Sequence, residues 1–215
     1  MFYSKWGVYQ KLYLDLWVRP KLLNTYLEQI KTREKPLFIH INRTAGSSIA
    51  NSLEITEAHH TFSAYKKLYK KKFNESFPED LEVWTAIRNP FDKVVSEYYY
   101  RIQTNQNKMK THPISFDDWV KKVFLEKDVA YRDREIMFIP QSEWLVGAEA
   151  YSLNIIKFES LQKDYKTLAT KFSAKPLVWK KKTENFNYKD EFSEVSKKII
   201  SDVFKEDLDR FGYFF

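Results

Sequence analysis

The sequence predicts a three-layer α/β fold, in which a central and mostly parallel sheet is flanked by helices. Residues 38–49 (FIHINRTAGSSI) and residues 84–98 (WTAIRNPFDKVVSEY) each place a short apolar run before a turn and a helical pattern. Such runs are typical of buried parallel strands, and strands that alternate with helices build α/β layers. The chain has 215 residues, 43% hydrophobic and 17% aromatic, which is enough to bury a sizeable core.

The first of these segments has the composition of an anion-binding loop. Apolar residues at 38–41 suit a strand, and those at 49–53 recur at helical spacing. The small residues between them let the backbone approach a phosphate, and the N–H groups and dipole of a helix start favour negative charge. Arg43 adds a fixed cation with several donors. The residues expected to bind the anion are Arg43, Thr44, Ala45, Gly46, Ser47 and Ser48.

The second segment repeats this design. Residues 83–87 suit another buried strand, Arg88 follows its end, and Pro90 suits the first turn of a helix that continues to about Ile102. Arg88 and Ser96 stand two helical turns apart, so both can reach one anion. Two such sites indicate a nucleotide that carries phosphates at two separate places.

Together the segments resemble the sulfotransferase superfamily, most closely its carbohydrate-type, family 2-like branch. Residues 38–48 correspond to the family's F-x-H-I-P-K-T-G-G-T-S, and residues 88–98 to its R-N-P-x-x-R-x-x-S-x-Y. Three further matches follow in the family's order, at residues 140–145 (PQSEWL), 155–161 (IIKFESL) and 206–213 (EDLDRFGY). Short strings such as these occur by chance in many proteins. Five matches in the family's order are therefore stronger evidence for the resemblance than either phosphate motif alone.

The resemblance implies a P-loop-like fold and a sulfuryl donor, 3′-phosphoadenosine-5′-phosphosulfate (PAPS), with 3′-phosphoadenosine-5′-phosphate (PAP) as the product. In the family the first loop holds the 5′-phosphosulfate, which here assigns residues 43–48 to it. The arginine and serine of the second motif, here Arg88 and Ser96, hold the 3′-phosphate. The implied acceptor is a hydroxyl, and the branch points to a carbohydrate or glycan precursor.

The chain departs from the family in the first loop. Asn42 and Arg43 stand where the family has Pro-Lys, and Ala45 replaces the first glycine. The family's lysine contacts the bridging oxygen of the leaving group. Arg43 can stabilise negative charge there, but a guanidinium stays protonated at any physiological pH, which excludes proton donation. Ala45 is tolerated at negative φ and crowded at positive φ, so a catalytically impaired nucleotide- or polyanion-binding module stays open as an alternative.

Transfer to an alcohol also needs a general base, and histidine is the side chain best matched to that role near neutral pH. His59 and His60 follow the first phosphate helix, and residues 60–64 (HTFSA) look like the H-x-T-A-type segment that carries the catalytic histidine in related sulfotransferases. His60 is therefore favoured over His59. Glu54 and Glu57 are weaker alternatives, because other branches use a glutamate downstream of the first loop.

Other classes of function fit less well. A Walker-type kinase shares the strand, loop and helix, but Ser47 stands where its motif needs lysine and Ile41 where it needs the first glycine. A kinase-like phosphotransferase is kept as the enzymatic alternative. The net charge of +7 fits any anionic ligand and gives no reason to infer a nucleic-acid partner. The chain has no cysteine, which excludes thiolate metal sites, and no metal is expected.

The sequence also predicts the organisation of the chain. A single domain is expected over residues 1–215, with residues 1–35 as a helical extension packed on it and a helix from about Val8 to Ile30 that is interrupted near Pro20. No apolar run reaches the roughly 18 residues that span a bilayer. The sequence also shows no secretory signal pattern and has no cysteine. We therefore expect a cytoplasmic protein with no integral membrane association.

Three local patterns predict further structure. His40 lies inside the first strand and is expected to be a core histidine rather than a catalyst. Ser115, with Asp118 three residues later, is expected to cap a helix. Apolar residues at helical spacing predict a core-facing helix over residues 190–211.

Overall fold

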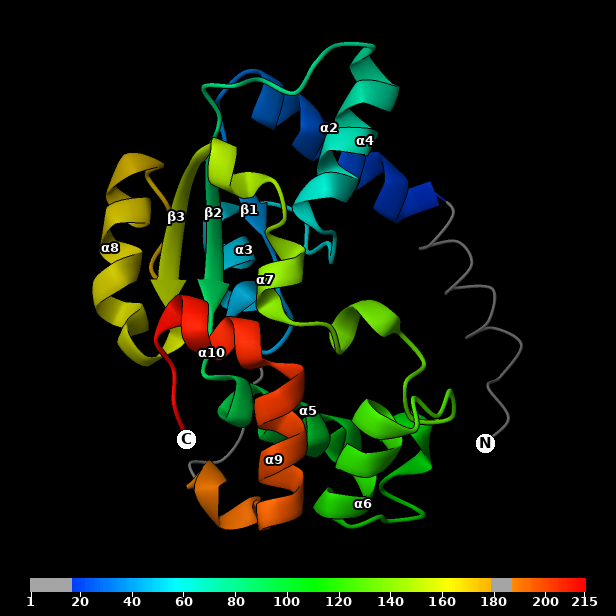
Figure 1. The fold of residues 1–215 in the computed structure, drawn as a ribbon. Coiled ribbons are helices and arrows are strands. Elements are labelled where there is room, and N and C mark those ends of the chain that lie inside the picture. Colours follow the sequence, from blue (N-terminus) through cyan, green and yellow to red (C-terminus); the bar gives the residue numbers. More distant parts are fainter. Residues whose placement is uncertain (1–16, 179–186) are drawn as a thin grey trace.

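The computed structural model describes residues 17–178 and 187–215, and within them three parallel strands form one sheet (Figure 1). The strands are β1 (Leu37–Ile39), β2 (Glu82–Ile87) and β3 (Ser152–Lys157), and β2 lies in the centre. All three point the same way, so their carboxyl ends meet at one edge of the sheet. This arrangement confirms the predicted α/β class.

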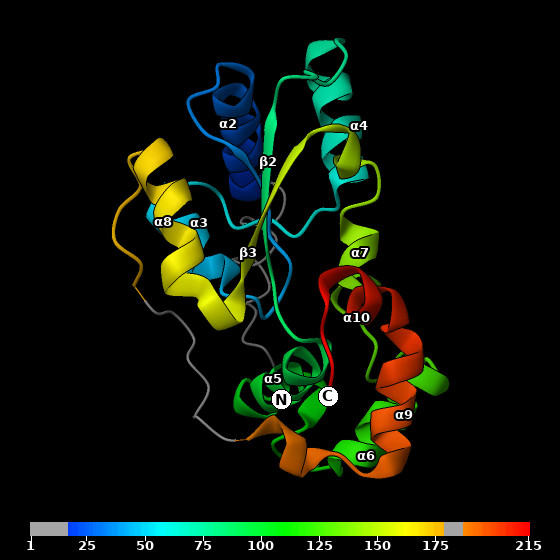
Figure 2. The same ribbon diagram turned by 60° about the vertical axis from the view of Figure 1, so that its left-hand side comes forward.

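Helices cover both faces of the sheet (Figures 1 and 2). On one face lie α3 (Gly46–Leu53) and α8 (Leu161–Lys171). On the other lie α4 (Phe62–Phe73) and α7 (Gln141–Trp144), whereas α2 (Arg19–Lys31) lies beside β1, where its Tyr26 hydroxyl accepts from the Phe38 N–H, and contributes to the same core cluster as α4. In the described part of the chain, no helix combines the length and the apolar character that crossing a membrane requires.

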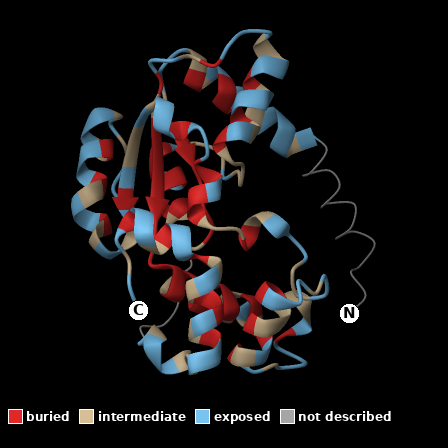
Figure 3. Cartoon of the chain, viewed as in Figure 1, coloured by how far each residue is buried: buried red, intermediate tan, exposed pale blue. Residues whose placement is uncertain are grey.

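The side chains of β2 alternate between these two layers, as the period of a strand requires. Val83 and Ile87 join the core cluster that includes α2 and α4, whereas Trp84 and Ala86 join the cluster that includes α3 and α8. All four are buried, and the strand is red along most of its length in Figure 3. Burial on both faces explains why the sequence of β2 reads as a nearly continuous apolar run.

A third group of helices lies beyond the carboxyl ends of the strands (Figure 1). It contains α5 (Pro90–Gln103), α6 (Phe116–Val120) and α9 (Glu194–Val203), which share their own core cluster. The chain also forms a last α-helix, α10 (Lys205–Phe211). Short helical turns connect the main elements: η2 (Gln106–Lys108), η3 (Lys121–Leu125), η4 (Glu135–Met137), η5 (Ala148–Ala150), η6 (Phe158–Ser160) and η7 (Tyr188–Glu191).

Two predictions about helix ends can be compared with the structure. The Asp118 backbone N–H donates to Ser115 Oγ at 3.1 Å, so Ser115 caps α6 as expected. Pro20 lies in the first turn of α2, and residues 17–18 just before it are helical with a π-type pattern, so the type of helix changes near Pro20, where an interruption was predicted. The earlier part of that predicted helix, residues 8–16, lies outside the described residues.

The predicted continuous helix over residues 190–211 is wrong. The chain forms α9 and α10, which meet at Phe204, and Val195 is exposed instead of facing the core. The turn at Phe204 lets α10 run past the start of α7, where the Asp207 carboxylate accepts backbone hydrogen bonds.

Candidate functional site

The first anion loop connects the end of β1 to the start of α3. Its backbone contains two left-handed residues, Arg43 with φ of 64° and Ala45 with φ of 66°. Ala45 is the N-cap residue of α3, so the conformation that crowds a side chain occurs where the family has glycine. A left-handed residue with a Cβ costs about 1–2 kcal/mol. The Thr44 hydroxyl donates to the Ile41 carbonyl at 2.9 Å and closes the loop.

Gly46 is required at the start of α3 because a buried imidazole lies against it. A Cβ at Gly46 would stand 2.0 Å from His40 Cδ2, closer than any side chain allows. His40 is buried, as expected of a core histidine. Its ring also contacts the His59 ring at a tilt of 43°, with 4.3 Å between the ring centroids. His40 therefore fills the space between the loop and the segment that carries the candidate base.

Two polar contacts hold residues 57–59 beside the first anion loop. Ser47 Oγ donates to Glu57 Oε2 at 2.9 Å, and His59 Nδ1 lies 2.9 Å from the His40 carbonyl oxygen. A carbonyl only accepts, so this bond holds the proton of neutral His59 on Nδ1 and leaves Nε2 as an acceptor. His60 packs edge-on against Tyr65 of α4, and burial lowers its pKa.

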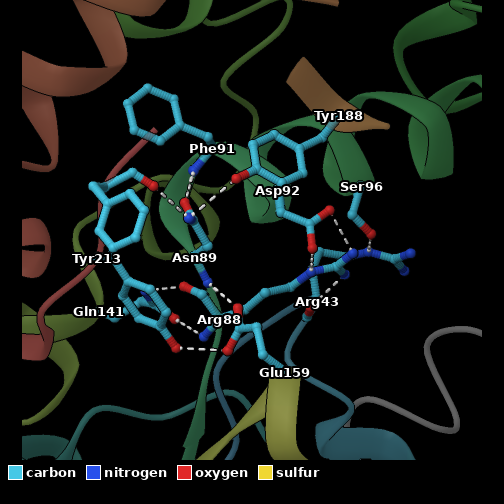
Figure 4. Close-up of polar contacts among 11 residues, drawn as sticks. Arg43, Arg88, Asn89, Phe91, Asp92, Ser96, Gln141, Glu159, Tyr188 and Tyr213 are labelled. Carbon is cyan, nitrogen blue, oxygen red and sulfur yellow. Dashed lines mark hydrogen bonds and ion pairs between the residues drawn. The ribbon is translucent and has the colours of Figure 1, made fainter. Parts of the chain in front are cut away.

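The second motif forms the predicted strand, turn and helix. Phe91 N–H donates to the Asn89 side chain, which caps α5, and Pro90 occupies the first turn. Arg88 follows the end of β2, and its Nε and Nη2 each donate to the Asp92 carboxylate at 2.7 Å (Figure 4). The guanidinium also stacks over the Phe158 ring at 4.0 Å.

Arg43 joins the two motifs. Its carbonyl accepts a hydrogen bond from Arg88 Nη1 at 3.1 Å, and its own Nε donates to Ser96 Oγ at 3.0 Å (Figure 4). Its guanidinium lies 4.4 Å from the centre of the Tyr100 ring. Burial lowers the pKa of Arg43, the Glu97 carboxylate opposes that shift, and the Arg88 cation adds to it. The structure thus brings Arg88 and Ser96 together through Arg43.

The backbone of Arg88 is held by two later segments of the chain. Arg88 N–H donates to Gln141 Oε1 at 3.0 Å, and Gln141 Nε2 donates back to the Arg88 carbonyl at 2.9 Å. Asp207 accepts from the backbone N–H groups of Gln141 and Ser142, both at 2.7 Å. All of these side chains are buried, so the last turns of the chain fix the end of β2.

Glu159, in η6 just after β3, supports the same strand end. Its carboxylate accepts from the Asn89 backbone N–H at 2.7 Å and from the Tyr213 hydroxyl at 2.8 Å (Figure 4). Asn89 Nδ2 donates to the Phe214 carbonyl at 2.9 Å. Gln141, Glu159 and Asp207 lie in matched segments, but the sequence analysis gave them no part in the site.

A buried polar network also links the first loop to α5. Asn42, which replaces the family's proline, donates to Glu97 at 3.2 Å, and Glu97 accepts from Arg101 Nε at 2.8 Å. Lys93 lies one helical turn before Glu97, and burial lowers its pKa to about 8. The sequence analysis did not identify this network.

Comparison with known proteins agrees with this geometry. A family model described as Sulfotransferase family matches residues 29–214 and so includes both anion loops and the three later segments. Searches among curated proteins and among solved structures give no significant match. Transfer of a sulfuryl group is the reaction of the matched family. The chain therefore belongs to the sulfotransferase family, in its family 2-like branch.

Proposed function

We propose that the chain transfers the sulfuryl group of PAPS to a hydroxyl of a carbohydrate acceptor and releases PAP. One observation carries the proposal: two strand–loop–helix segments start at the carboxyl ends of neighbouring parallel strands and are joined through Arg43. One nucleotide with phosphates at its 5′ and 3′ positions would occupy both. Adenine-nucleotide specificity and the carbohydrate acceptor come from the family resemblance.

The proposed reaction is an in-line displacement at sulfur. The acceptor oxygen bonds to sulfur while the bond from sulfur to the bridging phosphate oxygen breaks, and the proton of the acceptor passes to a base. The N–H groups at the start of α3 would stabilise the charge that develops on PAP, and Arg43 would add to this once its guanidinium leaves Ser96, to which it donates in this structure. Arg88 and Ser96 would hold the 3′-phosphate.

Two histidines are candidates for the base, and the geometry favours His59. Its Nδ1 bond to the His40 carbonyl fixes the tautomer whose Nε2 can accept a proton, and its segment lies along the anion loop. His60 is half-buried against an aromatic ring, and burial lowers its pKa, which weakens it as a proton acceptor.

Calorimetric titration with PAP, ATP and adenosine 5′-phosphosulfate tests the nucleotide assignment. Adenosine 5′-phosphosulfate lacks the 3′-phosphate, so the site proposed here should bind PAP more tightly than either of the other two. Arg88→Ala should weaken PAP binding by about 1.5–3 kcal/mol, because it removes a charge-assisted contact. A preference for ATP with magnesium would instead support the kinase-like alternative.

A comparison of His59→Ala with His60→Ala tests the base. Loss of a general base reduces a rate by about 10²–10⁴-fold, so His59→Ala should abolish most transfer from PAPS while PAP binding stays intact. His60→Ala, the matched control one residue away, should keep most of the activity. The opposite result would assign the base to His60, and two active variants would point to Glu57 or Glu54.

An acceptor screen separates the remaining alternatives. Purified protein with labelled PAPS is offered hydroxyl groups of saccharides, of simple phenols and of tyrosine peptides. Label on the saccharides alone supports the carbohydrate assignment. An impaired binding module would bind PAP and transfer to none of them, and strain at Ala45 is the feature that favours this second candidate.

A further inference from the structure

Arg88 already has an anionic partner within the chain. Its Nε and Nη2 form a two-pronged contact with the Asp92 carboxylate, each at 2.7 Å, and its Nη1 donates to the Arg43 carbonyl at 3.1 Å (Figure 4). A guanidinium has five N–H bonds, so three are in use. The pair of parallel bonds to Asp92 occupies the edge that best recognises a carboxylate or phosphate.

The position of Asp92 strengthens this contact. Asp92 lies in the first turn of α5, where the helix dipole favours negative charge, and four residues after Arg88. The Arg88 and Asp92 side chains are 10% and 22% exposed, so water screens the pair only in part. A phosphate that approaches Arg88 therefore meets a carboxylate already in the most favourable place.

We propose that Asp92 competes with the nucleotide 3′-phosphate for Arg88 and thereby limits the affinity and lifetime of bound PAP. The inference rests on the proposed function, because it needs the 3′-phosphate to bind at Arg88. A phosphate must displace the carboxylate or share the guanidinium beside a like charge, and either costs free energy. A nucleotide without a 3′-phosphate leaves the pair intact and does not bear this cost.

The test compares two ligands and two kinds of variant. PAP and adenosine 5′-phosphate (AMP) are titrated into wild-type protein, Asp92→Asn and Asp92→Ala, and PAP release is followed by stopped-flow displacement. Asp202→Asn is the matched control, because it removes the same charge from an exposed i, i+4 ion pair with Lys198 on α9. Thermal unfolding checks that each variant is folded, and two substitutions at Asp92 guard against misfolding of one.

Both Asp92 variants should bind PAP about two- to fivefold more tightly, which is the contribution of a partly exposed ion pair expressed as a dissociation constant. PAP release should slow by a similar factor, because affinity differences of this kind lie mostly in the dissociation rate. AMP binding should change by less than about twofold, and Asp202→Asn should leave both ligands unaffected.

Unchanged or weaker PAP binding in the Asp92 variants would overturn the inference and show that Asp92 orients Arg88 for the ligand. An equal gain for PAP and AMP would also overturn it, because that result reflects net charge alone. Failure of the proposed function looks different, since wild-type protein would then bind PAP no better than AMP. In that case both proposals fall.

Discussion

Lys93 provides a quantitative test of the electrostatics beside the site. Its side chain is 2% exposed, and the ammonium lies 3.5 Å from the Met137 carbonyl oxygen. Burial lowers its pKa from 10.5 to about 8, while the Glu97 and Asp207 carboxylates act in the opposite direction. The folded chain therefore holds this proton less tightly than the unfolded chain does.

The sign and size of the effect on stability follow from these two pKa values. Below about pH 8 the side chain is charged in both states, and the folded state bears the full cost of burying the charge. Between about pH 8 and 10.5 only the unfolded state keeps the proton, so the free energy of unfolding rises with pH. Each pH unit between the two pKa values contributes about 1.4 kcal/mol, and the two values differ by about 2.5 units. The free energy of unfolding therefore rises by roughly 3 kcal/mol.

Urea unfolding of the wild type and of Lys93→Met, measured from about pH 7.5 to 10.5, isolates this contribution. Methionine keeps the length of the side chain and cannot titrate, and other groups that titrate in this range are common to both proteins. The wild-type free energy of unfolding, minus that of the variant, should rise by roughly 3 kcal/mol across the range. Parallel profiles would refute the argument. A difference that falls with pH would mean that the carboxylates outweigh burial.

Other substitutions test the backbone of the site. Gly46→Ala should lower the free energy of unfolding by about 1–3 kcal/mol and abolish PAP binding, because its Cβ would meet a buried imidazole. Gly147→Ala is the control: its φ of 85° strains an alanine but its Cβ meets no clash, so PAP binding should remain. Equal loss of PAP binding in both variants would contradict this explanation. Ala45→Gly should stabilise the fold by about 0.5–1 kcal/mol, since relief of the left-handed strain exceeds the cost of the entropy that glycine adds to the unfolded chain. A lower midpoint of thermal unfolding would show that the backbone at Ala45 is not strained. Gln141→Ala should cost about 2–4 kcal/mol in urea unfolding, because both backbone groups of Arg88 lose buried partners, and a loss below about 1 kcal/mol would mean that water replaces them.

The two anion loops could be predicted because each is a local pattern. A buried strand, a turn of small residues or proline and a helix all leave signals within about fifteen neighbouring residues, and the structure has these elements at residues 37–53 and 82–103. The ion pair between Arg88 and Asp92 was also within reach, because the two residues are four apart in the sequence and Asp92 falls in the first turn of the predicted helix. The sequence analysis read Arg88 only as a ligand for phosphate and so missed it.

Contacts between distant segments could not be predicted in the same way. The choice between His59 and His60 depends on a hydrogen bond to residue 40, and the backbone of Arg88 depends on residue 141. The break at Phe204 is of the same kind, since apolar spacing continues through it while the chain turns. Periodicity reports which residues are buried, but not which distant group satisfies a buried polar atom.

The contacts that hold the carboxyl end of β2 affect when, during synthesis, the proposed nucleotide site can form. Both phosphate loops are encoded before residue 97, but the groups that hold the strand end come from residues 141, 159, 207 and 214. Contacts over such separations form late, because a long loop must close before they contribute. A nascent chain would carry both proposed phosphate loops well before the end of β2 is held, so the proposed nucleotide binding is expected to appear only once residues 207–214 have left the ribosome.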